Sequence, residues 1–212
     1  NGKFSIPLCT IEGTLAASMN RGLYASSLCG GIKVKHFRQE LSRSPIFIFD
    51  DLNKSDEFQT WINKNTEEII KAAQSTTKHG KILRIDQHAI QNYVLLDFIL
   101  DTGNAAGQNM VTLATNVACD YIKQQTGHDF FLDSNLASDK KASYRNLILG
   151  RGHGVIAETH VNKSVMTRVL NVDPDFIIKN WTYFPIVSAM AGTHGNAIHV
   201  SNALTAIYLA TG

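Results

Sequence analysis

The chain has 212 residues, of which 44% are hydrophobic and 18% are charged, and its formal net charge is +2 with a pI near 8.4. This is enough chain for a well-buried core and for one large or two small domains. The charge is too small to predict a nucleic-acid-binding protein, so we expect no nucleic-acid partner.

The three cysteines (Cys9, Cys29 and Cys119) are far apart in sequence and form no CxxC pair. A disulfide framework or a zinc knuckle is therefore not expected, and a reducing compartment is favoured. No transmembrane span or signal peptide is visible, which predicts a soluble, cytoplasmic protein, with a membrane anchor upstream of Asn1 left open. The chain begins without methionine and stops just after an apolar stretch at Gly212, as a fragment would.

The first elements are predicted from hydrophobic periodicity. Lys3–Pro7 is expected to form a short strand. A helix is predicted from Thr14 to Leu28, because its apolar residues fall near one face and Gly30-Gly31 follows it. Glu12 stands just before this helix, where a carboxylate can accept hydrogen bonds from free backbone amides, so helix capping is one interpretation of this residue.

The central part of the chain has the order βαββαβ, which is that of a ferredoxin-like split unit. The predicted fold class is therefore α+β, with a larger mixed α/β domain and an inserted small ferredoxin-like domain. The small domain takes residues 45–131, and the large, discontinuous domain takes residues 1–44 and 132–212. The predicted elements of the small domain are, in order, the strand Ile46–Phe49, a helix beginning at Ser55-Asp56, the strands Lys81–Ile85 and Tyr93–Leu100, the helix Ala105–Gln125 and the strand Asp129–Leu132.

The stretch Gly103–Met110 precedes the second helix of this unit and contains two glycines among small side chains. Such a stretch permits a close approach of the backbone, and the free amides at the start of a helix attract phosphate. A purely structural turn would give the same Gly-x-x-x-Gly pattern. The stretch matches neither GxGxxG nor a Walker motif, which disfavours an ordinary Rossmann or P-loop site.

The stretch Ser138–Lys141 contains an aspartate followed by two adjacent lysines. Paired lysines are usually hydrated surface residues, but Asn135 and Asp139 flank these two and favour a functional interpretation. A cation about 4 Å from a forming oxyanion contributes roughly 4 kcal/mol at an effective dielectric constant near 20. That energy corresponds to about three decades in rate.

Beyond this stretch, Leu147–Leu149 is predicted to be a strand, and a last helix is predicted from about Ser201 to Ala210. The eight histidines raise the question of a metal site. His194 and His199 are five residues apart, there is no HExxH, and no cysteine or carboxylate stands at zinc spacing, so no metal is expected.

Several segments together resemble the 3-hydroxy-3-methylglutaryl-coenzyme A (HMG-CoA) reductase family. They occur in the family's order and at compatible spacings over nearly the whole chain, which corresponds to the central part of the family's catalytic domain. The spacing is closer to the eukaryote-like class I enzymes than to the bacterial class II enzymes. The segments are Ile6–Gly22, similar to the family's glutamate motif; Gly103–Met110, similar to its cofactor signature; Ser138–Lys141, similar to its D-K-K loop; and Ser188–Gly212, similar to its S-A-M-A-G to T-A-I-Y segment.

The resemblance implies an oxidoreductase that reduces an acyl-CoA thioester to an alcohol, mevalonate, with two hydrides from NADPH, in the mevalonate pathway of isoprenoid biosynthesis. It implies that Lys140 is the cation that stabilises the oxyanion and that Glu12 is the proton donor. It also implies a homodimer or homotetramer with the active site at the subunit interface, and residues 45–131 as the NADP-binding domain. The positions that match substrate-binding residues of the family are Arg43, Lys141, Lys179, Asn202, Ser18, Asn20 and Arg21. The positions that match its cofactor-binding residues are Lys78, Asn104, Gly107, Gln108, Asn109, Met110, Asn135 and Asp139.

The chain departs from the family pattern at several places. Asn104 and Gln108 replace an aspartate and a methionine of the cofactor signature, and residues 142–146 (Ala-Ser-Tyr-Arg-Asn) replace the usual P-A-A-I-N after the lysines. The family's catalytic aspartate would come directly after Gly212, and its catalytic histidine further on. Two alternatives therefore stand beside the reductase: a non-catalytic homologue or truncated fragment that serves as a binding or assembly module, and a reductase of another acyl-CoA or carrier-bound thioester.

Overall fold

The computed structural model describes residues 3–138, 142–193 and 200–212. It combines helices with a sheet whose registered strand pairs are antiparallel, which confirms the α+β class. The strands are β1 (Lys33–Arg43), β2 (Ile46–Ile48), β3 (Lys81–Ile90), β4 (Tyr93–Asp101), β5 (Phe130–Phe131) and β6 (Gly152–Glu158). The helices are α1 (Gly13–Leu28), α2 (Leu52–Gln74), α3 (Gln108–Thr126), α4 (Tyr144–Leu149), α5 (Lys163–Val165), the π-helix η1 (Met166–Leu170), α6 (Pro174–Trp181), α7 (Phe184–Ala191) and α8 (Val200–Thr211).

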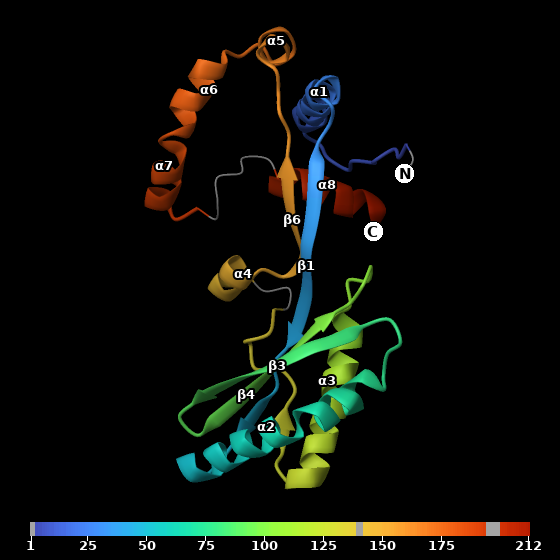
Figure 1. Ribbon diagram of the computed structural model, residues 1–212, viewed down its shortest axis with the longest axis vertical. Helices are drawn as coiled ribbons and strands as arrows, with labels where there is room; N and C mark the ends of the chain where they lie inside the picture. The colour runs from blue at the N-terminus through green and yellow to red at the C-terminus, as the bar shows by residue number, and fades with distance from the viewer. Residues whose placement is uncertain (1–2, 139–141, 194–199) are drawn as a thin grey trace. The chain divides into compact units, whose positions relative to one another are not determined.

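The chain forms two compact units (Figure 1). One unit is His36–Val155, and the other combines the residues up to Lys35 with Ile156–Gly212. We call them the central unit and the terminal unit. The strands of the sheet follow the order β5-β2-β4-β1-β6, and β3 pairs with β4.

Strand β4 is the middle of the central unit. Its whole length pairs with β3 along one edge, while β2 and the end of β1 share the other edge. Every residue from Val94 to Leu100 is buried, so both faces of the strand are covered. Because side chains alternate along a strand, one face presents Leu95, Asp97 and Ile99, and the other presents the even-numbered residues.

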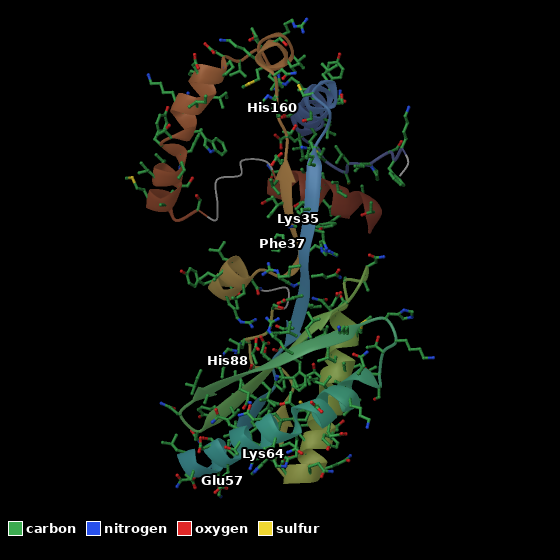
Figure 2. The ribbon with its side chains drawn as sticks, viewed as in Figure 1. Lys35, Phe37, Glu57, Lys64, His88 and His160 are labelled. Carbon is green, nitrogen blue, oxygen red and sulfur yellow. The ribbon has the colours of Figure 1, made fainter. Side chains whose placement is uncertain are left out.

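The even-numbered face of β4 belongs to the hydrophobic core of the central unit. Helices α2 and α3 lie side by side against the strands (Figure 1), and their buried residues fill this core. Helix α2 begins at Leu52, earlier than predicted, because the Asp51 carboxylate caps it by accepting a hydrogen bond from Lys54 N at 2.9 Å. Glu57 and Lys64, labelled in Figure 2, lie on the exposed part of the same helix.

Two predictions of local structure are wrong, and one strand was missed. Lys3–Pro7 forms no regular strand. Strand β1 was not predicted because six charged or histidine residues hide its alternation. The predicted strand Leu147–Leu149 is the end of helix α4. This helix starts because the Ser143 hydroxyl accepts a hydrogen bond from Asn146 N at 3.1 Å, and that cap outweighs the strand preference of a short apolar run.

The terminal unit contains α1, the helices from α5 to α7, and α8. Helix α1 packs against η1 and α8, and its buried residues include Leu15 and Ala25. The segment before α1 is tied to α8 by a hydrogen bond from Cys9 N to the carbonyl oxygen of Ala206, at 2.9 Å. Among the residues that the structure describes, no helix combines the length and the apolar character needed to cross a membrane.

The burial of β4 gives a stability prediction. Phe98 is fully buried in the core, whereas Phe131 is 65% exposed at the edge of the same sheet. We expect Phe98→Ala to lower the free energy of unfolding by about 3–5 kcal/mol, because it removes apolar contacts and leaves a cavity. Phe131→Ala should change it by less than about 1 kcal/mol. Urea denaturation followed by circular dichroism measures both, and equal losses would contradict this account of the core.

Candidate functional site

A hollow of 420 Å³ lies between the segment before α1 and helix α8 in the terminal unit. We call it the acyl hollow, and Glu12 and Asn202, both predicted from sequence, line it together although they are far apart in the chain. Its apolar lining comes from residues such as Leu15 and Leu209. A space with an apolar wall and a few polar groups is typical of a small-molecule site.

Glu12 occupies the N-cap position of α1, with extended backbone angles, yet its side chain makes no capping hydrogen bond. Instead the carboxylate accepts a hydrogen bond from the Thr14 hydroxyl at 3.3 Å, and the Thr10 hydroxyl accepts one from Glu12 N at 3.0 Å. The capping interpretation of Glu12 is therefore wrong. Its exposed carboxylate borders the hollow without taking part in the helix hydrogen bonds.

A second hollow, of 470 Å³, lies along the first turns of α1. Glu12 lines it too, together with Ser18 and Arg21, which stand three residues apart and therefore share one face of the helix. The predicted coenzyme A contacts Ser18 and Arg21 thus lie beside the predicted acid. Asn20, on α1, and Lys179, on α6, are exposed and line neither hollow.

In the central unit, the turn before α3 has a tightly fixed backbone. Gly107 has a φ of 79°, and a Cβ there would lie 2.3 Å from Thr102 Cγ2, so only glycine fits. The Thr102 hydroxyl donates to the carbonyl of Ala105 at 2.8 Å, and the Asp101 carboxylate accepts from Gly103 N at 2.8 Å. Of the predicted cofactor residues, Asn104 and Asn109 are exposed here, and Gln108 and Met110 are half-buried.

The turn that carries Lys78 packs against the start of α3. A Cβ on Gly80 would lie 2.5 Å from Met110 Sδ, and one on Gly103 would lie 3.7 Å from the carbonyl oxygen of His79. The structure therefore brings the neighbours of Lys78, itself exposed, next to the predicted cofactor segment.

Arg43 ends β1 and is largely buried, with its side chain 13% exposed. Its guanidinium donates to the Thr112 hydroxyl on α3 at 3.0 Å and forms an ion pair with Asp133 at 3.3 Å. In the same region Asn135 adopts a left-handed conformation with a φ of 66°, and its backbone N–H donates to the Asp133 carboxylate at 3.2 Å. The predicted residues Arg43 and Asn135 are thus linked through one carboxylate.

Asp139, Lys140 and Lys141 lie outside the described residues, as do His194 and His199. Ser138, where the described chain reaches this segment, is buried and bonded to β1. No group of three or more histidine, cysteine or acidic side chains that could hold a metal occurs in the described part of the chain.

Sequence reasoning missed several residues around these sites. Cys9 and Thr205 line the acyl hollow. Thr205 stands three residues after Asn202, so the helical spacing was a usable signal for it. Arg145 and Asp97 form a buried ion pair beside Ser138, and no sequence signal connects two residues so far apart.

Comparison with known proteins identifies the family. The model of the family "Hydroxymethylglutaryl-coenzyme A reductase" matches residues 1–212. The 3-hydroxy-3-methylglutaryl-coenzyme A reductase of Methanothermobacter thermautotrophicus is 36% identical over 215 residues, covering 100% of this chain and 54% of that protein. The protein of the same name from Aeropyrum pernix is 35% identical over 215 residues, covering 100% of this chain and 51% of the relative. The chain spans about half the length of these curated relatives.

Among solved structures, the class II 3-hydroxy-3-methylglutaryl-CoA reductase from Streptococcus pneumoniae bound to NADPH is similar in fold. The TM-score is 0.63 at 14% sequence identity, and the match covers 90% of this chain and 49% of that one. The family match over the full sequence and the shared fold lead to one conclusion: the chain belongs to the hydroxymethylglutaryl-coenzyme A reductase family.

Proposed function

We propose that this chain is part of an NADPH-dependent HMG-CoA reductase, which reduces the thioester of HMG-CoA to the alcohol mevalonate. The observation that carries the proposal is that Glu12 and Asn202 line one hollow, since two residues matched to family motifs at opposite ends of the chain converge there. The names of the relatives favour this activity over a non-catalytic binding module.

The chemistry assigns different tasks to two residues. The reaction consumes two hydrides and two protons and releases coenzyme A as a thiol. Lys140 would stabilise the oxyanion that forms when the first hydride reaches the thioester carbonyl. Glu12 would donate a proton to the reduced oxygen, and the exposed position of its carboxylate beside the acyl hollow supports this role.

The two hollows beside Glu12 support a division of the substrate between them. Asn202 would hold the HMG group in the acyl hollow. Arg43, Lys141 and Lys179 match further ligands of that group in the family pattern. Ser18, Asn20 and Arg21 would contact coenzyme A, and Arg21 suits its phosphates because a guanidinium binds phosphate with two parallel hydrogen bonds.

We further propose that residues 45–131 are a ferredoxin-like domain for NADPH, and that residues 1–44 and 132–212 form the substrate domain. The pairing of β2 with β5 and β4, and of β4 with β3, is the strand arrangement of such a unit, and α2 and α3 are its two helices. The glycine turn at the start of α3 supports a contact with the dinucleotide phosphates. Asn104, Gly107, Gln108, Asn109, Met110, Asn135 and Asp139 would line the dinucleotide site.

The Streptococcus pneumoniae relative is bound to NADPH, which supports the choice of cofactor here. As in the family pattern, the active protein would be a homodimer or homotetramer with its site at the subunit interface.

The central test is the intact protein with Lys140→Ala. We expect kcat to fall by about 10²–10³-fold or more, because a positive charge at the developing oxyanion is lost, while the circular dichroism spectrum stays unchanged. Consumption of NADPH in the presence of HMG-CoA measures the rate. Lys64→Ala, on the exposed part of α2, is the matched control and should keep the wild-type rate. Full activity of Lys140→Ala would refute the role of Lys140.

Lys78 gives a prediction about the cofactor. We expect Lys78→Ala to raise the KM for NADPH by about 10- to 100-fold, since a charge-assisted contact to the 2′-phosphate is worth about 1.5–3 kcal/mol. The KM for NADH, which lacks this phosphate, should stay unchanged. Steady-state kinetics with both cofactors separates the effects, and equal changes for the two would exclude Lys78 as a phosphate ligand.

The rate at which Cys9 is chemically labelled tests whether substrate occupies the acyl hollow. Cys9 is exposed and lines the hollow, whereas Cys119 is buried, and burial raises the pKa of its thiol so that the reactive thiolate is suppressed. Iodoacetamide should therefore label Cys9 and leave Cys119 unmodified in the folded protein. HMG-CoA should slow the labelling of Cys9, as measured by mass spectrometry. Labelling of Cys9 at the same rate with saturating HMG-CoA would place the substrate elsewhere.

A further inference from the structure

Asp97 is a fully buried carboxylate to which the proposed reaction gives no task. It lies on the odd-numbered face of β4, opposite the hydrophobic core, with no exposed surface. The Ser44 hydroxyl and the Arg145 guanidinium both donate hydrogen bonds to it. A buried carboxylate is tolerated only when a partner of this kind compensates for lost hydration.

Arg145 does more than neutralise this charge. Its Nη2 contacts Asp97, while its Nη1 donates to the carbonyl oxygen of Leu136 at 3.2 Å and approaches the Ser42 hydroxyl at 3.5 Å. Leu136 comes just before the segment 139–141, and Arg145 comes just after it. One guanidinium therefore joins Leu136 to Arg145 and connects both residues to Asp97 on β4.

The chain is also fixed at Ser138, immediately before that segment. Ser42 and Ser138 bond reciprocally: Ser42 N donates to Ser138 Oγ at 2.8 Å, and Ser138 N donates to Ser42 Oγ at 2.9 Å. Arg151 Nε adds a hydrogen bond to the Ser138 carbonyl at 2.7 Å. We call these contacts, with the Asp97–Arg145 pair, the loop clasp.

The loop clasp leaves no space for a ligand. The hollow that Ser42, Ser138 and Arg145 line has a volume of only 20 Å³, which is room for about one water molecule. The buried polar groups are thus used to hold the chain, and they hold it next to the residues with which the proposed function performs its chemistry.

We propose that Asp97 and Arg145 are positioning residues, which fix Leu136, Ser138 and Arg145 on the two sides of the segment 139–141 and thereby support the catalytic role of Lys140. The proposal rests on the role of Lys140 in the proposed function. A misplacement of about 1 Å at a reacting group can cost about 10²-fold in rate, so a loosened clasp should be visible in kcat.

The test is the double variant Asp97→Asn/Arg145→Met in the intact protein. Removing both charges avoids an uncompensated buried charge, so the variant should fold, and the asparagine oxygen can still accept from Ser44. Limited proteolysis with a lysine-specific protease should cleave after Lys140 and Lys141 about tenfold faster than in the wild type, because local opening of this segment costs less. Its kcat should fall by about 10²-fold.

Lys123→Met is the control, since Lys123 forms an ion pair with Asp129 at 2.6 Å near the end of α3 and does not line the hollow of the loop clasp. It should leave both cleavage and kcat unchanged. Unaltered cleavage after Lys140 and Lys141 in a folded double variant would overturn the proposal, and so would equal acceleration at every lysine. If the double variant does not fold, Ser138→Ala decides. It removes the hydroxyl that accepts from Ser42 N and keeps the bond from Ser138 N to Ser42 Oγ. It should accelerate the same two cleavages, and an unchanged rate overturns the clasp.

The result separates this proposal from the proposed function. Full turnover by Lys140→Ala would refute the catalytic assignment while the protease still reports whether the clasp holds the chain. An inactive Lys140→Ala together with normal kcat and cleavage in the double variant would keep the catalytic assignment and remove the positioning role of Asp97 and Arg145.

Discussion

The central unit depends on the double-sided burial of β4. Its even-numbered side chains, such as Phe98, pack under α2 and α3. On its odd-numbered face, Asp97 forms an ion pair with Arg145. Because the period of a strand is two residues, a slip by one position would exchange the two faces. Such a slip would place the Asp97 carboxylate in the hydrophobic core, at a cost of several kcal/mol per buried ion. It would also place the ring of Phe98 next to the Arg145 guanidinium. The ion pair therefore specifies the strand register as well as the loop attached to it.

Much of the fold could be predicted because its signals are local. The helices α1, α3 and α8 were predicted to within a few residues, since apolar periodicity and flanking glycines act over one or two turns. The buried strand β4 was visible as an apolar run, Tyr93–Leu100, that only Asp97 interrupts. The start of α3 was identified as a special turn from its glycines, and the structure gives the reason: Gly107 is left-handed and closely packed against Thr102.

The features that were missed or misinterpreted depend on contacts between residues far apart in the chain. A short stretch of sequence does not contain both partners of such a contact. Asp97 looked like an interruption of an apolar run, because its partner Arg145 is 48 positions away. Glu12 looked like a helix cap, and only the position of α8 shows that its carboxylate borders a hollow with Asn202 instead. Strand β1 is mostly exposed and charged at its start, so it lacks the alternation that would identify a half-buried strand. Each of these errors has the same physical cause: the deciding interaction is tertiary.

The Asp97–Arg145 pair and the proline of the family pattern restrain the same segment by different physics. Proline restricts the backbone locally and acts largely by lowering the entropy of the unfolded chain, so it needs no partner. An ion pair acts through the folded state and requires both residues, because either one alone leaves a buried charge uncompensated. The arginine after the lysines is consequently useful only in a chain that also carries a carboxylate on the odd-numbered face of β4. The two positions are therefore energetically coupled, even though they lie in segments with different tasks, one in the sheet and one beside the lysines.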